Sequence, residues 1–341
     1  MNTAADMDGM DLVDEDFIAI LCCPETRQPL RRADAETLVT DDGQISYRIR
    51  DGIVDFTTKL GDAKKPAPKD VVKDYYEEAG WNADDAGVYD DTKRFMALGP
   101  VSRDYTRRCN EQVKTQLPPK GKYIVDAGSG AIPHVEYMAY HDNFDIRVCT
   151  DFSFAALQEA KRKLGAKGRY VMADLRCLPF KDASVDGVVC CHVVYHVPEQ
   201  EQATAIMELS RILSPRGKAA IVYQWGKADL LWQMTKLFRV IDRVSPPKPE
   251  PKAVEQPARP AEESLYFYAH TYDWFVSRDW PFKYEIRSFR ILDNPMMKRY
   301  LRDTPIWRMV VRLLVAWQAI MPNFTGKHGA YPLLILYPTI R

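Results

Sequence analysis

Apolar runs and amphipathic stretches alternate along the middle of the chain, between residues 120 and 225. The apolar runs have the length and composition of buried strands, and they are Tyr123–Asp126, Ile146–Thr150, Arg169–Met172, Val185–Cys191 and Lys218–Tyr223. Helical patterns occupy Ala155–Leu164 and Glu199–Leu213. Strands that alternate with helices imply right-handed crossovers and a parallel sheet. The pattern therefore predicts an α/β domain.

The alternation is less regular after residue 225. The expected elements there are a helix at Asp229–Val244, a helix at Thr271–Arg278, a strand at Lys283–Phe289, an apolar helix at Ile306–Met321 and a strand at Tyr331–Tyr337. Prolines crowd residues 245–260 and predict an extended linker. We expect two insertions, at residues 227–265 and 294–328, to fold over the ligand as a lid.

The chain before the α/β region divides into three parts. Residues 1–14 are acidic and small, which predicts disorder, and residues 15–58 show short strand patterns with a turn at Asp51-Gly52. Residues 59–119 read as a linker and a helical cap that ends at Pro118-Pro119. The main domain then covers residues 120–341.

Charge and cysteine content limit the partners and the compartment. Basic and acidic residues are equal, at 47 each, so no global field attracts nucleic acid, and we expect no nucleic-acid partner. The seven cysteines show no disulfide-framework spacing, which fits a reducing cytoplasm. The acidic N-terminus does not resemble a signal peptide. Arg308 and Arg312 interrupt the longest apolar helix, so we expect no transmembrane segment.

The strongest chemical signal is Asp126-Ala-Gly-Ser-Gly130, at the end of the first apolar run. Glycines in a strand-to-helix turn let the backbone bend sharply and approach a ligand closely. A purely structural turn is the alternative. A nicotinamide cofactor is the chemical competitor, but its fingerprint needs a third glycine at position 133, where this chain has Pro133. Asp126 also suits a cationic ligand better than a pyrophosphate.

Further polar residues follow the next strands. Asp151 ends the second strand and could accept both ribose hydroxyls of a nucleoside, with Phe152 beside it. Asp174 follows the third strand and could accept from an adenine amino group, with Leu175 against the ring. Cys191 and His192 end the fourth strand. Ordinary helix capping and packing remain the alternative reading of each residue.

Taken together, these motifs resemble the class I methyltransferase superfamily, and within it the type 11, quinone-biosynthesis-like branch. The matching segments are Asp126–Gly130, Asp151, Asp174–Phe180, Ser184–Asp186 and Glu208–Gly217. The resemblance implies a Rossmann-like, seven-stranded sheet with helices on both faces. It also implies S-adenosylmethionine as cofactor, held by Asp126, Gly128, Ser129, Gly130, Asp151, Phe152, Asp174, Leu175, Cys191 and His192. Ile132 departs from the pattern, since it replaces the last glycine of the first motif.

The N-terminal segment resembles a second family, the small zinc-ribbon-like tRNA-methyltransferase activators. Members commonly hold zinc between two cysteine pairs, whereas this segment has only the adjacent Cys22 and Cys23. A structural zinc site needs four ligands. We therefore expect a small β-rich domain without metal.

The resemblance implies methyl transfer from a sulfonium to a nucleophile, for which alignment supplies much of the rate. A hydroxyl or acidic-carbon acceptor needs a base, and His196 and His192 are the candidates because they follow the fourth strand. The expected acceptor is a small, lipid-like or natural-product molecule. The helix at residues 306–321 could cover it, form a homodimer contact, touch a membrane surface or pack in the core. A non-catalytic binding protein remains the alternative, and a nicotinamide oxidoreductase is a more distant one.

Overall fold

The computed structural model describes residues 11–57, 99–244 and 266–338. Most of the predicted disordered N-terminus, the predicted linker and the proline-rich stretch at residues 245–260 lie outside the described residues. Within them, most expected elements are present, and their ends differ from the predicted ones by at most five residues.

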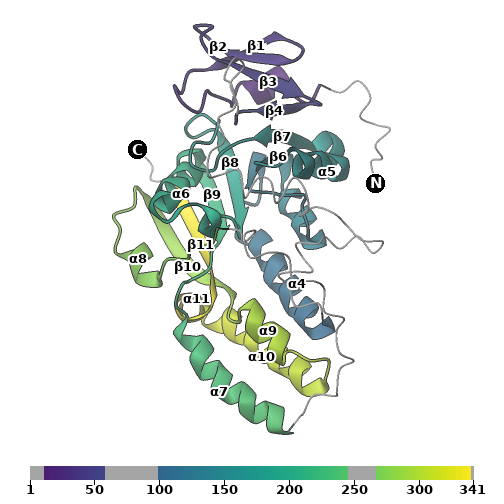
Figure 1. Ribbon diagram of the computed structural model, residues 1–341, viewed down its shortest axis with the longest axis vertical. Coiled ribbons are helices and arrows are strands. Elements are labelled where there is room, and N and C mark those ends of the chain that lie inside the picture. Colours follow the sequence, from purple (N-terminus) through teal and green to yellow (C-terminus); the bar gives the residue numbers. More distant parts are fainter. Residues whose placement is uncertain (1–10, 58–98, 245–265, 339–341) are drawn as a thin grey trace.

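The core of the molecule is one continuous sheet (Figure 1). The strands of the main domain, which the sequence pattern predicts, are β5 (Gly121–Ala127), β6 (Phe144–Asp151), β7 (Gly168–Met172), β8 (Val185–Cys191), β9 (Leu213–Val222), β10 (Phe282–Arg290) and β11 (Tyr331–Pro338). These seven strands lie in the order β7-β6-β5-β8-β9-β11-β10. The strands β5 to β9 are parallel, and β11 and β10 are antiparallel to their neighbours. The predicted Rossmann-like α/β fold with a seven-stranded sheet is confirmed.

The position of the site follows from this topology. The strand order reverses at β5, which lies between β6 and β8, and ligands of open α/β sheets bind at such a point, beyond the carboxyl ends of the strands. Because β11 is antiparallel to both β9 and β10, the start of β11 and the end of β10 lie at the edge formed by the carboxyl ends of the parallel strands. We call this the carboxyl edge.

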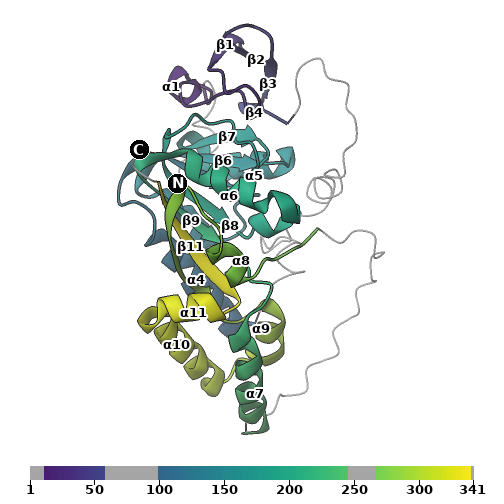
Figure 2. The same ribbon diagram turned by 90° about the vertical axis from the view of Figure 1, so that its left-hand side faces the viewer.

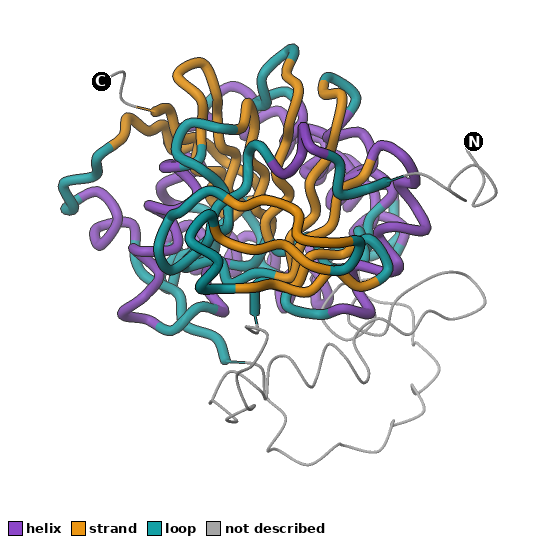
Figure 3. The backbone as a smooth tube through the Cα atoms, turned by 90° about the horizontal axis from the view of Figure 1, so that it is seen from above, coloured by secondary structure: helices purple, strands orange, loops and turns teal. Residues whose placement is uncertain are grey.

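Helices flank the sheet on both sides, as the view from above shows (Figure 3). The helix α5 (Phe154–Leu164) begins where Ser153 accepts a hydrogen bond from the Ala156 amide, and it packs against β6 and β7. The helix α6 (Gln202–Arg211) is shorter than expected, because a separate 3-10 turn forms at Glu199–Glu201 and β9 starts at Leu213. The helix α4 (Pro100–Lys114) crosses the end of β10.

One local prediction is wrong. The expected strand-to-helix turn does not open directly into an α-helix. The chain instead runs through an irregular segment into a 3-10 helix, η3 (Val135–His141). Positive φ angles at Gly130 and Ile132 explain the difference, because an α-helix cannot pass through left-handed residues.

The N-terminal region extends the sheet rather than forming a detached unit. Its elements are α1 (Glu15–Ile18), β1 (Leu30–Asp34), β2 (Thr37–Thr40), β3 (Ser46–Arg50) and β4 (Ile53–Asp55). The last strand, β4, pairs in parallel with β7, so that eleven strands run continuously from β1 to β10. The four N-terminal strands lie at one end of the molecule in both side views (Figures 1 and 2).

The remaining helices gather at the opposite end of the molecule (Figure 2). They are α7 (Asp229–Val244), α9 (Asn294–Tyr300), α10 (Pro305–Ile320) and α11 (Pro322–His328), while the short α8 (Tyr272–Val276) lies beside β10. One face of α10 is buried through Trp307, Val311 and Leu314, and its other face exposes Leu313 and Ile320. No helix among the described residues is long and apolar enough to cross a membrane.

Candidate active site

The glycine turn after β5 is fixed by backbone bonds to β6. The amides of Gly128 and Ser129 both donate to the carbonyl of Thr150, at 2.8 and 3.0 Å. Gly128 has a φ of 72°, and a Cβ there would meet the Val193 side chain at 2.4 Å. Glycine is therefore needed at position 128 both for the backbone conformation and for this packing.

Ile132, which stands where the family motif has its last glycine, adopts a backbone conformation that glycine favours. Its φ is 53°, in the left-handed region that β-branched residues rarely adopt, and its side chain is 2% exposed. The Lys163 ammonium donates to the carbonyls of Ala131 and Ile132 at 2.7 and 2.9 Å. These bonds, together with burial of the Ile132 side chain, offset the strain of the turn.

Asp126 faces a cation inside the protein. The fully buried Arg147 guanidinium donates to Asp126 Oδ2 from Nη2 and, at 3.1 Å, from Nε. Its Nη1 donates to the carbonyl of Tyr137 at 2.6 Å. A signal for this pair exists in the sequence, since an arginine within a buried parallel strand needs a partner. The expected role of Asp126 toward a cationic ligand stays a prediction.

Asp151 connects the glycine turn to the start of α5. Its Oδ2 accepts from the Gly130 amide at 2.8 Å, and its Oδ1 accepts from the Ser153 amide at 3.0 Å. Burial raises the pKa of this carboxyl above its ordinary value, and these backbone bonds oppose the shift. A carboxylate has about four acceptor sites, so both oxygens can accept further bonds. Phe152 follows it and is half-buried.

Asp174 lies at the carboxyl end of β7 beside a partner that the sequence motifs did not reveal. Arg176 Nε donates to both of its carboxylate oxygens, at 2.9 and 3.1 Å, and the same guanidinium also pairs with Glu201. Burial raises the pKa of Asp174. Leu175, between the two charged residues, is buried. Spacing alone could have suggested this pair, because an arginine two residues after an aspartate in a turn can reach back to it.

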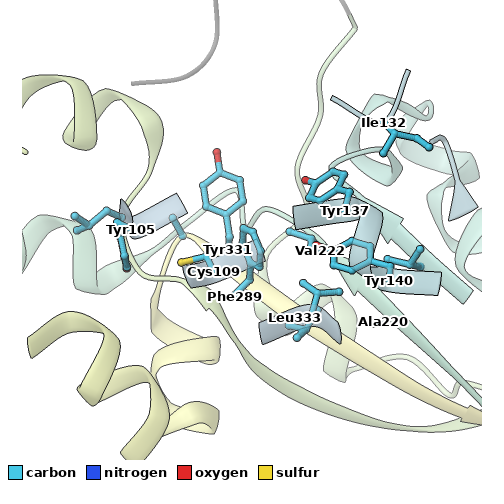
Figure 4. Packing of buried hydrophobic residues seen from close by; sticks show 14 of the residues in the cluster. Tyr105, Cys109, Ile132, Tyr137, Tyr140, Ala220, Val222, Phe289, Tyr331 and Leu333 are labelled. Atoms are coloured by element: carbon cyan, nitrogen blue, oxygen red, sulfur yellow. The ribbon is translucent and has the colours of Figure 1, made fainter. Parts of the chain in front are cut away.

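The end of β8 contributes Cys191 and His192. His192 has a φ of 64°, and its ring stands edge-on to Phe289 at 5.3 Å and to Tyr331 at 5.4 Å. Figure 4 shows Phe289 and Tyr331 close together beside Cys109 of α4. Burial, and then the positive charge of Arg290, lower the pKa of His192 well below its ordinary value. The His192 imidazole is therefore neutral at physiological pH.

His196 lies one turn further along, in the 3-10 helix Val194–His196. Its Nδ1 is 2.8 Å from the carbonyl oxygen of Tyr266. A carbonyl can only accept, so Nδ1 carries the proton. Burial lowers the pKa of His196, which keeps the ring neutral and leaves Nε2 with a free lone pair.

The aromatic residues that follow β9 lie in different surroundings. Trp225 is buried against Tyr223 and Tyr272, whereas Trp232 on α7 is 66% exposed, with the Lys236 ammonium 3.5 Å above its ring. A shallow surface pocket is lined by Glu199, Gln200, Tyr268, Ala269, His270, Thr271, Trp274 and Arg278. None of the predicted cofactor residues lines it.

The Glu208 and Arg211 motif holds the N-terminal region in place. Glu208 accepts from the Leu178 amide at 2.9 Å and pairs with Arg211 and with Arg27. Arg27 also donates to the carbonyl of Leu178 at 2.9 Å. This motif therefore joins α6, the 178–180 segment and the N-terminal strands, and its function is structural.

The two N-terminal cysteines are buried among protein groups. Cys23 Sγ lies 3.0 Å from the Tyr47 hydroxyl, and all seven cysteines are free thiols. Within residues 11–57, 99–244 and 266–338, no three His, Cys, Asp or Glu side chains gather as a metal site would require. The expectation of a metal-free domain stays a prediction.

Comparison with known proteins gives two matched families. Residues 125–221 match the methyltransferase domain family, and residues 14–52 match the Trm112p-like protein family. A curated relative is the O-methyltransferase rstn1 of Aspergillus nomiae, which is 24% identical over 172 residues, or 48% of this chain and 72% of the relative.

Solved structures with a similar fold include a Haloferax volcanii complex of the Trm112 methyltransferase activator with a methyltransferase. That match is 16% identical with a TM-score of 0.43, and it covers 70% of this chain and 92% of the other. A second is the DhpI complex with S-adenosylhomocysteine, 11% identical with a TM-score of 0.47, covering 80% and 97%. Residues 125–221 are thus similar to a methyltransferase domain, and the chain is an enzyme.

Proposed function

We propose that this enzyme, a methyltransferase that uses S-adenosylmethionine, methylates a hydroxyl oxygen of a small, moderately apolar acceptor by direct displacement. The curated relative that is named an O-methyltransferase supports oxygen as the acceptor atom. An acidic carbon would need the same kind of base and is the other acceptor atom considered. The quinone-biosynthesis-like resemblance favours a lipid-like or natural-product acceptor.

The polar groups beyond β5, β6 and β7 fit the cofactor. When bound, S-adenosylmethionine supplies an electrophilic methyl group on a positively charged sulfur. Asp151 offers free acceptor sites to the ribose hydroxyls. Asp174, beside the buried Leu175, is the proposed acceptor for the adenine amine, which would share its oxygens with Arg176. Gly128, Ser129, Gly130, Phe152, Cys191 and His192 complete the proposed cofactor site.

The glycine turn also argues against a nicotinamide cofactor. The amides of Gly128, Ser129, Gly130 and Ile132 all donate to groups within the protein. A pyrophosphate is bound in dinucleotide folds by backbone amides that point at the ligand. These four amides are already used, so the turn is unsuited to a pyrophosphate.

We choose His196 as the base because of its tautomer. Tyr266 fixes the proton on Nδ1, and burial keeps the ring uncharged, so Nε2 can accept the proton of an acceptor hydroxyl. His192 is also neutral, but its ring is enclosed by Phe289 and Tyr331, which suits contact with the cofactor better than proton transfer.

The helices α9, α10 and α11 are placed to enclose the acceptor. They connect the end of β10 to the start of β11, and both of these points lie at the carboxyl edge. Gln318 of α10 donates to the Phe289 carbonyl at 2.9 Å and accepts from the Tyr105 hydroxyl at 2.5 Å, which fixes α10 to this edge. Such a cover would exclude water during transfer.

The test is a kinetic comparison of His196→Ala, His192→Ala and the control His328→Gln, a histidine in α11. Release of S-adenosylhomocysteine is followed over a panel of hydroxylated aromatic compounds. We expect His196→Ala to lower kcat by about 10²–10⁴ while S-adenosylhomocysteine affinity is retained. Wild-type kcat in both the His196 and the His192 variants would exclude a histidine base. Absence of cofactor binding by the wild-type protein would favour the non-catalytic alternative.

A further inference from the structure

We propose that Arg290 binds a negatively charged group of the methyl acceptor, so that the acceptor is an anion such as a carboxylate or a phosphate ester. This inference rests on the proposed function, because it assigns the substrate class of the same site. Three properties of Arg290 support it: the lack of a carboxylate partner among the described residues, its position at the carboxyl edge, and its separation from the residues proposed to hold the ribose and the adenine.

Arg290 is a buried cation that has no carboxylate partner among the described residues. The side chain ends β10 and is 3% exposed. Nη2 donates to the Asn294 amide oxygen at 2.8 Å, while Nε is buried without a hydrogen-bond partner. In the described part of the chain, no carboxylate lies within 4.0 Å of this guanidinium, since Arg290 forms none of the ion pairs found there.

Two other buried arginines each have a carboxylate partner. Arg147 pairs with Asp126, and Arg169 pairs with Asp14 at 2.5 Å. Removing a guanidinium from water without a counter-ion costs several kcal/mol, so an unpaired one persists where a ligand supplies the missing charge. Groups that lower stability in the free protein are typical of binding sites. Arg290 differs from Arg147 and Arg169 in this respect.

Arg290 lies close to Tyr331 and, through it, to His192. Its guanidinium carbon is 4.4 Å from the centre of the Tyr331 ring, and that ring is 5.4 Å from the ring of His192. Burial lowers the pKa of His192 and of His134 in the segment before η3, and the positive charge of Arg290 adds to both shifts. Arg290 therefore belongs to the same edge of the sheet as the end of β8 and the glycine turn.

The sheet order separates Arg290 from the residues proposed to hold the ribose and the adenine. In the sheet, β8, β9 and β11 lie between β5 and β10. The residues proposed to hold the ribose and the adenine follow β6 and β7, on the other side of β5. An acceptor that lies beyond His192, away from the nucleoside, would extend toward β11 and β10, where Arg290 lies. The planar fork of a guanidinium matches the oxygens of a carboxylate or phosphate.

The cofactor also carries a carboxylate, so the experiment must separate the two sources of negative charge. Benzoate and inorganic phosphate are titrated into the cofactor-free protein by calorimetry, and S-adenosylhomocysteine is titrated separately. The variants are Arg290→Met, Arg290→Lys and the control Arg287→Gln, an arginine of the same strand that pairs with Glu285 on the surface. Thermal unfolding is recorded for every variant.

We expect at least one of the two anions to bind the wild-type protein and the Arg287→Gln control equally. Affinity should fall about tenfold to a hundredfold in Arg290→Met and by less in Arg290→Lys, which keeps the charge but not the fork. S-adenosylhomocysteine affinity should stay within about threefold of wild type. The Tm of Arg290→Met should be equal to or above that of wild type, because an unmatched buried charge is removed.

Several results would overturn the inference. No binding of either anion to wild-type protein, or wild-type anion affinity in Arg290→Met, would show that Arg290 binds no such group. A loss of S-adenosylhomocysteine affinity of about tenfold or more in Arg290→Met would assign the charge to the cofactor's carboxylate. A lowered Tm in that variant would make Arg290 a structural residue. If the wild-type protein failed to bind S-adenosylhomocysteine, the proposed function would fail, while the anion titrations would still decide the role of Arg290.

Discussion

The guanidinium of Arg147 donates from two of its nitrogens to a single oxygen of Asp126, and both side chains are buried. These residues come from the neighbouring strands β6 and β5, at the centre of the sheet. The carboxylate that begins the glycine motif therefore balances an internal charge. Loss of activity in an Asp126 variant would consequently report on folding as well as on the cofactor.

Asp126→Ala should destabilise the protein by about 3–5 kcal/mol, because it leaves Arg147 as an unpaired buried cation. The double variant Asp126→Leu with Arg147→Met removes both charges and should recover most of that loss. Urea unfolding of Asp126→Ala, of the single variants Asp126→Leu and Arg147→Met, and of the double variant measures the coupling. If Asp126→Ala unfolds at the wild-type urea concentration, the pair does not contribute to stability.

Asp151→Ala should weaken S-adenosylhomocysteine binding about tenfold to a hundredfold, because the ribose loses a charged acceptor. Asp145→Ala is the matched control, since Asp145 is an exposed aspartate at the other end of β6. Calorimetry on both variants provides the comparison. Equal affinities would mean that Asp151 serves only the Gly130 and Ser153 amides.

Much of the fold could be predicted because periodicity is a local property. The five parallel strands and α5 follow directly from their apolar patterns, and the carboxyl-edge residues follow from strand ends. The charge pairs could not be predicted with the same certainty. Arg176 reaches Glu201, and β4 joins β7, through contacts that depend on the folded arrangement. Arg290 could not be identified because nothing in its local sequence signals a buried and unmatched charge.

Acid should destabilise this protein more than its balanced charge suggests. Burial lowers the pKa of His141 to about 4, with the charge of Arg147 adding to the effect, and burial also lowers the pKa of His134 to about 4. Both values lie below the 6.5 of an exposed histidine, so the unfolded chain binds more protons as the pH falls. Stability is therefore fully present above about pH 6.5 and declines toward about pH 4, by at most roughly 3 kcal/mol for His141.

Urea unfolding between pH 7 and pH 4 checks this linkage in wild type, His141→Gln and the control His328→Gln. The His141 variant should lose less stability over that interval than the other two proteins. Parallel pH profiles for all three would show that His141 is protonated equally in the folded and unfolded states.

The N-terminal region should fold without zinc. Its two cysteines are adjacent and buried, and Cys23 contacts the Tyr47 hydroxyl. Incubation with a chelator should leave the Tm unchanged, and elemental analysis of the purified protein should find no bound zinc. About one zinc per chain, lost in the Cys22→Ser variant, would contradict this expectation.

Ile132→Gly tests how the departure from the glycine motif is tolerated. Glycine adopts a φ of 53° freely, so the substitution relieves about 1–2 kcal/mol of backbone strain. It also deletes a buried aliphatic side chain, which costs about 2–5 kcal/mol through lost burial and the cavity left behind. The lost burial outweighs the relieved strain, so the variant should be less stable than wild type by about 1–3 kcal/mol. Cofactor affinity should change by less than about threefold, because the turn already has the shape that glycine would give it. Urea unfolding and S-adenosylhomocysteine titration measure the two effects separately. A variant more stable than wild type would mean that strain, not packing, dominates at this position.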